Sequence, residues 1–362
     1  SSAICLIGNL IYVFADQQIT YSLQALAASR FIVGFGAGNR SVCRANVASI
    51  TTINQRLTYL TMQATVVFFG YALTPGLGSL VANTDTVMLG IHFNKFTLPG
   101  LILIIFNVLT ILGMLALYDG SIRTRDGPPD SKNATTKHTL SNFTAVPERI
   151  VNIGAMVFVL LNFSARGILS VFETVSIPLF LQVTGSDPDS ASAVVKASNF
   201  QLYLGLLGLL SYASIEYFRY NLSDVNWVEL GFLTLLAGNV ILVVVRAEMS
   251  FWELAIAEFL VWSVGCPITT AVVVAAFSKL LGGRPQGTLM GFLGSAGSVS
   301  RIILPLLPGI IPTFTVFWID IFLCTLSILL LWWYSRLVHK TKRKMFNDTE
   351  LAVSLLPEFD SS

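Results

Sequence analysis

Three charged residues, Arg30, Glu173 and Glu258, lie deep inside long apolar stretches of the sequence. If those stretches are helices that cross a membrane, each charge lies roughly 10–14 Å below the surface, because a helix rises ~1.5 Å per residue. A lone charge at that depth costs at least ~2.5–3.5 kcal/mol, so it is expected to have a partner or a task. An arginine that approaches or leaves a carboxylate changes how readily the carboxylate binds a proton. The three side chains could pass protons, attract an anion, or form a static ion pair that fixes helix packing.

The composition indicates that the solvent around these charges is lipid. Of the 362 residues, 54% are hydrophobic and only 12% are charged, and the mean hydropathy is +0.72. An ordinary soluble domain is about 25% charged, so the chain is predicted to be a polytopic membrane protein. The net charge of +2 is close to zero, which argues against a nucleic-acid partner. The four cysteines and three histidines match no metal, redox or catalytic spacing, so we expect no cofactor, no metal and no enzymatic activity.

Ten stretches are candidates for membrane-spanning helices, each of which needs about 20 mainly apolar residues. They are 1–15, 21–48, 57–82, 97–118, 151–182, 197–218, 226–246, 251–278, 286–311 and 313–335. The polar connection 119–150 separates four spans from six. The chain enters its first apolar run at Ser1 without a signal-peptide pattern, so we expect a segment upstream to be missing.

The distribution of lysine and arginine predicts the orientation, because cytoplasmic loops are rich in both. One set of alternating connections, with the tail, holds fourteen such residues, and the opposite set holds only Lys95, Lys196 and Arg246. The fourteen are Arg56, Arg123, Arg125, Lys132, Lys137, Arg149, Arg219, Lys279, Arg284, Arg336, Lys340, Lys342, Arg343 and Lys344. The 119–150 linker and the tail 338–362, expected to be disordered, are therefore predicted to be cytoplasmic.

The spacing of charges suggests that the two groups of spans are repeats. From Arg30 to Arg56 is 26 positions, and from Glu258 to Arg284 is also 26. A proline in the following span lies 45 positions after Arg30, in "GYALTPGLG", and one lies 47 positions after Glu258, in "SRIILP". This match places Arg30 and Glu258 at corresponding points of two halves.

Four segments carry a resemblance to a known family. "RFIVGFGAGNRSVCRANVAS" (30–49) resembles the R-x-x-x-G-x-G pattern in the fourth helix of the major facilitator superfamily. "GYALTPGLG" (70–78) looks like a degenerate G-x-x-x-G-P motif of its fifth helix. "FETVSIPL" (172–179) and the segment 278–305 are similar to the lysosomal ceroid-lipofuscinosis-associated branch, and more distantly to the SPX-type major facilitators. Leu304 departs from that branch, which has a glycine before the following proline.

The resemblance implies an all-α polytopic membrane protein with the major facilitator fold and about ten transmembrane helices, four plus six, the first two of twelve being missing. The expected parts are an incomplete N-terminal bundle of helices 3–6 (1–118), a linker (119–150), a C-terminal bundle of helices 7–12 (151–337) and the tail (338–362). Helices 1, 4, 7 and 10 of this fold line a central cavity. Arg30, Glu173 and Glu258 fall on the last three, so they are the expected substrate and coupling residues.

Other residues are expected to control packing or gating, because small residues let membrane helices approach and prolines bend them. They are Gly34, Gly36, Gly38, Pro75, Arg166, Gly291, Gly294, Gly297, Arg301 and Pro305. Arg56, Lys279 and Arg284 are predicted in cytoplasmic loops. Arg40, Arg44, Lys279 and Arg284 lie near cytoplasmic helix ends, where we expect their side chains to reach lipid headgroups.

Three functions are compatible with the sequence. The first is a solute carrier of a lysosomal or endosomal membrane that works by alternating access, with protons as a candidate coupling ion. The second, brought by the family resemblance, is an anion (chloride) channel. The third is a transport-inactive scaffold or sensor. The expected partners are the lipid bilayer, a small solute or anion, and an adaptor at Leu355-Leu356, which follow Glu350 in a near match to an acidic dileucine signal.

Overall fold

The computed structural model describes residues 1–15, 22–81, 84–88, 91–94, 97–117, 147–187, 190–282 and 286–354. Most of the predicted linker, Arg284 and Leu355-Leu356 lie outside the described residues.

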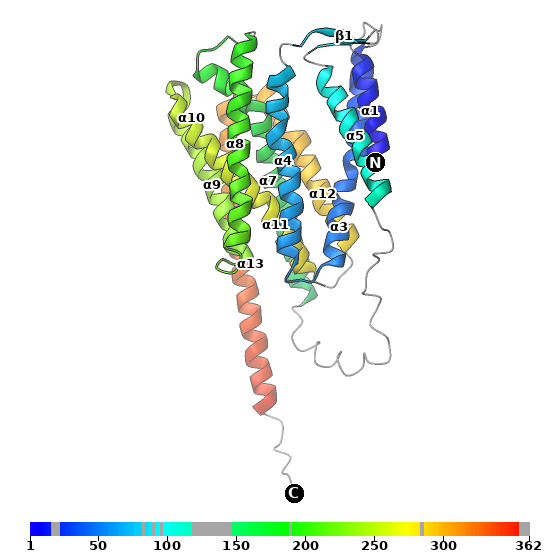
Figure 1. Cartoon of the computed structure of the whole chain (residues 1–362). Coiled ribbons are helices and arrows are strands. Elements are labelled where there is room, and N and C mark those ends of the chain that lie inside the picture. The colour runs from blue at the N-terminus through cyan, green and yellow to red at the C-terminus, as the bar shows by residue number, and fades with distance from the viewer. Residues whose placement is uncertain are drawn as a thin grey trace.

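The N-terminal half consists of helices and one short hairpin. The helices are α1 (Ser2–Ala15), α2 (Ser22–Gly36), the 3₁₀ segment η1 (Ala37–Asn39), α3 (Arg40–Ile50), α4 (Arg56–Val81) and α5 (Leu98–Leu117). The antiparallel strands β1 (Thr86–Met88) and β2 (Ile91–Phe93) pair Val87 with His92 between α4 and α5. The hairpin, absent from the all-α prediction, lies at the end of the bundle opposite to the end where α13 (Thr313–Ser354) projects (Figure 1).

In the described ranges, the regular elements of the C-terminal half are all helices. Its elements are α7 (Glu148–Val183), α8 (Ala191–Tyr217), α9 (Asp224–Val245), η2 (Arg246–Glu248), α10 (Phe251–Glu258), the π-helical segment η3 (Phe259–Gly265), α11 (Cys266–Leu281), α12 (Gln286–Ile303), the 3₁₀ segment η4 (Leu304–Gly309) and α13. α10, η3 and α11 form one continuous span.

These helices follow the ten predicted spans. Eight segments of the described chain are long and apolar enough to cross a membrane. Of the other two predicted spans, α1 is shorter, and 21–48 is divided by η1 into α2 and the more polar α3. The glycine-rich run 34–38 coincides with this division, as expected of residues that weaken a regular helix.

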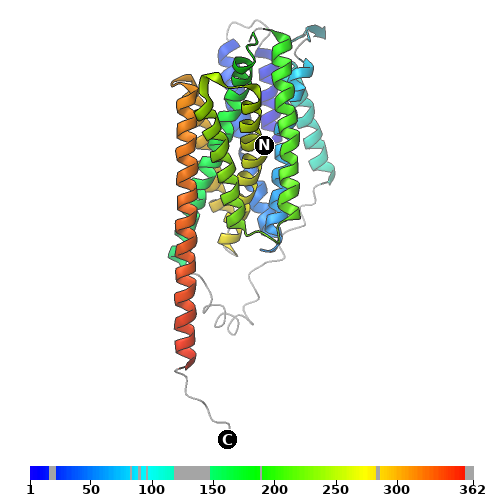
Figure 2. The ribbon, with the colours of Figure 1, turned by 90° about the vertical axis from the view of Figure 1, so that its left-hand side faces the viewer.

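The expectation of a disordered tail is corrected by α13. This helix does not end near residue 337 but continues to Ser354, well past the rest of the bundle (Figure 2). The extension is polar, so hydropathy gives no signal for it, although lysine, arginine and leucine are good helix formers.

The two halves contact each other along α4 and α8, where glycines permit a close approach. A Cβ atom added at Gly205 would lie 2.6 Å from the Cβ of Ala72, and one at Gly76 would lie 2.9 Å from Leu202. α7 and the α10–α11 span are the most buried of the membrane-length helices, whereas α5 has the smallest buried share. The core therefore lies in the C-terminal half, with α7 at its centre.

Candidate functional site

Two arginines from different helices converge on one tyrosine in the interior. Arg40 of α3 and Arg301 of α12 each donate a hydrogen bond to the hydroxyl oxygen of Tyr71 on α4, at 3.0 and 2.8 Å. Their guanidinium carbons lie 5.9 and 5.5 Å from the centre of the Tyr71 ring, within the range of cation–π attraction. Tyr71 therefore joins the N-terminal half to the C-terminal half.

A single carboxylate neutralises part of this charge. Glu173 of α7 accepts a 2.6 Å hydrogen bond from Nη2 of Arg301. The side chains of Arg301 and Glu173 remain 28% and 24% exposed, so water reaches this ion pair. An ion pair in contact with water can open without leaving a fully buried charge behind.

Two further arginines lie next to Tyr71 in a closed pocket. Arg44 of α3 and Arg166 of α7 line it together with Tyr71, Tyr212 of α8 and Thr270 of α11. The pocket volume is about 10 Å³, close to the smallest that holds one water. Among the described residues, neither Arg44 nor Arg166 is in an ion pair. We call Arg40, Arg44, Arg166 and Arg301 the arginine cluster; with Glu173 its formal charge is three positive.

Glu258 occupies a separate, fully buried site. It is 0% exposed, and its Oε2 accepts a 2.6 Å hydrogen bond from Nε2 of Gln201 on α8. Among the described residues, its Oε1 has no hydrogen-bond partner, and neither has the hydroxyl of Ser176. Glu258 is the last residue of α10, immediately before the π-helical η3. π-helical turns inside α-helices often occur at functional sites, because they turn side chains away from the regular register.

No group of three or more histidine, cysteine, aspartate or glutamate residues is close enough to hold a metal ion within the part of the chain that the structure describes. The side chains described above carry guanidinium, carboxylate, amide and phenol groups.

Comparison with known proteins agrees with this architecture. Major facilitator superfamily domain-containing protein 8 of Xenopus laevis is 23% identical over 360 residues, covering 84% of this chain and 70% of that protein. The human organic anion transporter MFSD10 has a similar structure with a TM-score of 0.62 and 21% identity, covering 91% of this chain and 76% of that one. FucP in its outward conformation has a TM-score of 0.53 at 13% identity, with coverages of 93% and 82%. No family profile matches the chain.

The chain has the fold of the major facilitator superfamily. Its fold and the order of its helices agree with the expectation from the four quoted segments. Within this fold the arginine cluster lies between the two bundles, where α3 and α4 of the first bundle meet α7 and α12 of the second.

Arg30 is not where the sequence places it relative to the two carboxylates. It is exposed on α2, its guanidinium lies 3.8 Å from the centre of the Tyr12 ring, and it pairs with neither Glu173 nor Glu258. Position along the span does not tell which face of the helix a charged residue occupies, and this face decides its partners. Glu173 instead pairs with Arg301, which the sequence assigns to packing or gating.

Arg40 and Arg44 are expected to reach headgroups, and the structure corrects this. Both point inward, to the hydroxyl of Tyr71 and to the closed pocket. Their spacing of four residues puts both on one face of α3, a pattern that could have suggested a shared interior partner. Tyr71, Gln201 and Tyr212 were missed, because single tyrosines and glutamines in apolar helices give no distinctive pattern.

Several of the small residues are in close helix contacts. A Cβ atom at Gly36 would lie 2.6 Å from the sulfur of Cys5, and one at Gly297 would lie 2.7 Å from Nδ2 of Asn162. A Cβ atom at Gly294 would come within 3.3 Å of the Cβ of Ser41, so this glycine permits the α3–α12 contact between the bundles. In contrast, Gly34, Gly38 and Gly291 face open space.

The prolines act as expected of helix breakers at one position and not at the other. Pro305 lies where α12 changes to the 3₁₀ segment η4, whereas Pro75 is accommodated inside α4. Leu304, which stands where the related branch has a glycine, packs over Gly167 of α7 and is 4% exposed. Gly167 of α7 therefore makes room for Leu304, so α7 and η4 still pack closely although position 304 is not a glycine.

The predicted cytoplasmic loop residues bind across helix ends. Nη1 of Arg56 donates to the carbonyl oxygens of Ser278 and Gly282, at 2.6 and 2.8 Å, which ties the start of α4 to the end of α11. Lys279 forms a 2.8 Å ion pair with Asp224 of α9. Only the first of these contacts joins the two bundles.

Proposed function

We propose that the chain is a carrier of small organic anions that works by alternating access between its two bundles. The observation that carries this proposal is the arginine cluster, in which four guanidinium groups from three helices are opposed by one carboxylate. Buried charges are normally paired, so an excess of positive charge between two mobile bundles supports an anionic occupant. MFSD10, which has a similar fold, is described as an organic anion transporter, and this agrees with the proposal.

Glu173 supplies a mechanism for coupling the anion to a proton. In the observed state its carboxylate occupies Arg301, where an anionic substrate would otherwise bind. Protonation of Glu173 would remove that competition and free Arg301 for the substrate. One proton and one monovalent anion would then cross together, and the anion would offset the positive charge that protonation of Glu173 adds to the cluster.

Glu258 is the second candidate for a proton site. Its partner Gln201 is neutral, and no cation faces it among the described residues, so its proton can be gained or lost without breaking an ion pair. We propose that Glu173 reports the presence of substrate, whereas Glu258 responds to bundle movement through η3.

The proposed location is a lysosomal or endosomal membrane with the C-terminus in the cytoplasm. The support is the resemblance of residues 172–179 and 278–305 to the lysosomal branch, the excess of lysine and arginine on one side, and the tail that carries Leu355-Leu356 as a candidate adaptor site. Imaging of the full-length chain, with and without Leu355→Ala/Leu356→Ala, tests this membrane location.

The transport proposal is tested by flux into vesicles. The purified chain is reconstituted in liposomes, and uptake of radiolabelled succinate and benzoate is measured with and without a pH gradient. Arg44→Gln/Arg166→Gln should reduce uptake about tenfold or more, because a hydrogen bond to a charged group contributes about 1.5–3 kcal/mol. Lys196→Gln, which removes an exposed charge on α8, should leave uptake unchanged. Equal loss in both variants would contradict the proposal.

An anion channel is the second candidate, and the small size of the closed pocket favours it. About 10 Å³ between Arg44 and Arg166 suits a monatomic anion better than an organic one. A channel predicts chloride currents proportional to voltage that persist without a proton gradient, whereas a carrier predicts saturable flux. A chain that shows neither activity, and that retains a stable protein partner, would instead be a scaffold or sensor.

A further inference from the structure

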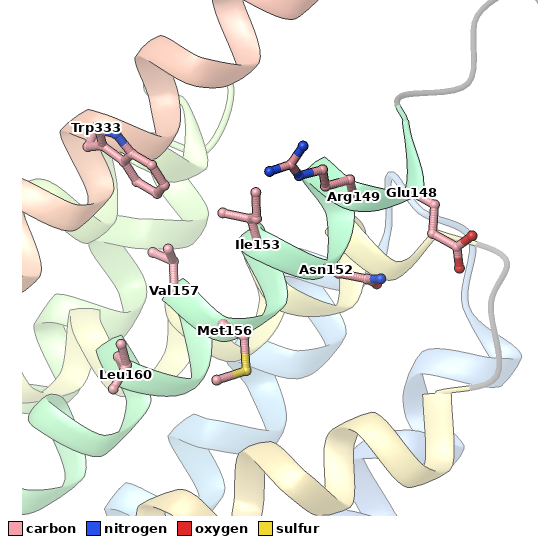
Figure 3. A pocket seen from close by; sticks show the side chains of 8 residues that line it. All are labelled: Glu148, Arg149, Asn152, Ile153, Met156, Val157, Leu160 and Trp333. Carbon is pink, nitrogen blue, oxygen red and sulfur yellow. The ribbon is translucent and has the colours of Figure 1, made fainter.

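A groove lies between α7 and α13, outside the arginine cluster, at the end of the bundle from which α13 projects. Its volume is about 640 Å³, within the usual range for small-molecule sites. Most of its lining is apolar and comes from Ile153, Met156, Val157 and Leu160 of α7, with the ring of Trp333 on α13 across from them (Figure 3). A small water-soluble anion would not be stabilised by contact with this apolar surface.

The mouth of this groove is positively charged. Arg149 points across the groove toward Trp333, whereas Glu148 points to the other side of α7 (Figure 3). Arg149 is exposed and is in no ion pair within the described part of the chain. The cation at the mouth is therefore free to meet a phosphate.

The extension of α13 adds further positive charge on the same side. Lys340 and Lys344 follow Trp333 by seven and eleven residues, so they lie on its face of the helix. Lys342 lies on the opposite face, nine residues from Trp333. All three lysines are exposed. An apolar groove that ends in aligned basic residues matches a molecule with a hydrocarbon chain and an anionic head.

We propose that this groove binds one anionic phospholipid. An acyl chain would lie along Met156 and Leu160 against Trp333, and the phosphate would lie between Arg149 and Lys340. Tryptophan is favoured at the boundary between hydrocarbon and headgroups, and basic clusters just outside a membrane helix bind anionic lipids. The lipid would hold α13 against α7, the helix that also carries Glu173 and Arg166.

Native mass spectrometry of the full chain tests the headgroup part. The protein is released from vesicles of equal phosphatidylcholine and phosphatidylserine, and the retained lipid is counted. Phosphatidylserine should be enriched, and Arg149→Gln or Lys340→Gln should lower its apparent affinity about fivefold. Lys342→Gln removes the same charge from the opposite face and should retain the lipid. No enrichment, or equal loss with Lys342→Gln, would overturn the proposal.

Fluorescence tests the acyl-chain part. Phosphatidylserine with brominated acyl chains should quench tryptophan emission more than brominated phosphatidylcholine, and Trp333→Phe should remove the difference. Trp332→Phe alters the neighbouring, similarly exposed ring and serves as the matched control. Soluble glycerophosphoserine should not displace the brominated lipid. If it does, or if Trp333→Phe quenches like the unaltered chain, the site is a headgroup patch and not the groove.

Discussion

Glu173 and Glu258 are carboxylates of the same bundle whose partners differ in charge. Glu173 is partly exposed and bound to a cation, whereas Glu258 is fully buried and bound to the amide of Gln201. A charged partner fixes the charge of a carboxylate, whereas an amide accommodates either form by rotating. The two positions should therefore respond differently to the same substitution.

For Glu173→Gln we expect anion binding to remain or become tighter while stimulation by a proton gradient is lost. A glutamine carries no charge, so Arg301 stays available to the substrate at every pH. The measurement is succinate uptake across a series of imposed pH gradients, with substrate affinity from counterflow at equal pH. If uptake by this variant still rose with the gradient, Glu173 would not be the coupling group.

For Glu258 the comparison is between glutamine and alanine. Glu258→Gln preserves the volume and can still bond to Gln201, so thermal stability in detergent should change little. Glu258→Ala leaves a cavity and an unpaired Gln201 amide, a loss of about 1–3 kcal/mol from the unsatisfied group alone. Melting of both variants, followed by tryptophan fluorescence, checks this order. Equal stability of the two would show that the hydrogen bond contributes nothing.

The pairing of these residues separates the part of the site that is predictable from the sequence from the part that is not. Hydropathy identifies four charges within apolar spans, namely Glu173, Glu258, Arg166 and Arg301. The order of residues along the chain is enough to detect them. It cannot show that Arg301 and not Arg30 meets Glu173, since that depends on helix rotation and on which helices are neighbours. Partners are set by packing in three dimensions, which no short pattern in one chain records.

At the scale of helices, ten spans could be predicted because a membrane requires a length and a composition. Three departures from regular helices of that length could not be predicted from the sequence. η1 and η3 change the hydrogen-bond register of a helix, which hydropathy does not record, and the polar extension of α13 has no apolar signal. The α4–α8 contact was also invisible, because its glycines are spread over two distant segments.

The α4–α8 contact predicts a sharp difference between two glycines. A Cβ atom at Gly205 would lie 2.6 Å from that of Ala72, whereas one at Gly78 meets nothing within 4 Å. Gly205→Ala should therefore lower the melting temperature and the flux. Gly78→Ala should preserve both, or raise stability slightly, since alanine favours a helix by about 1 kcal/mol over glycine. Equal tolerance at both positions would mean that α4 and α8 are not in close contact in the membrane.

At the scale of the whole molecule, the two bundles are held together at the predicted cytoplasmic end by Arg56. This residue is 6% exposed and donates to two carbonyl groups at the end of α11, where the helix dipole is negative. Gln286 of α12 donates to the same Gly282 carbonyl at 3.2 Å. The contact joins one bundle to the other through backbone atoms, so it can be lost without leaving an unpaired acidic side chain.

We therefore expect Arg56→Ala to shift the population of states toward one that is open at this end. Loss of a buried charge-assisted hydrogen bond of about 1.5–3 kcal/mol is enough to change a two-state ratio about tenfold or more. Spin labels at the exposed residues Asn54 and Thr288, on opposite bundles, would report this as a longer distance. Lys279→Gln is the control, because its ion pair with Asp224 lies within one bundle and should leave the distance unchanged. An unaltered distance in Arg56→Ala would show that the bundles are held together elsewhere, along α4 and α8.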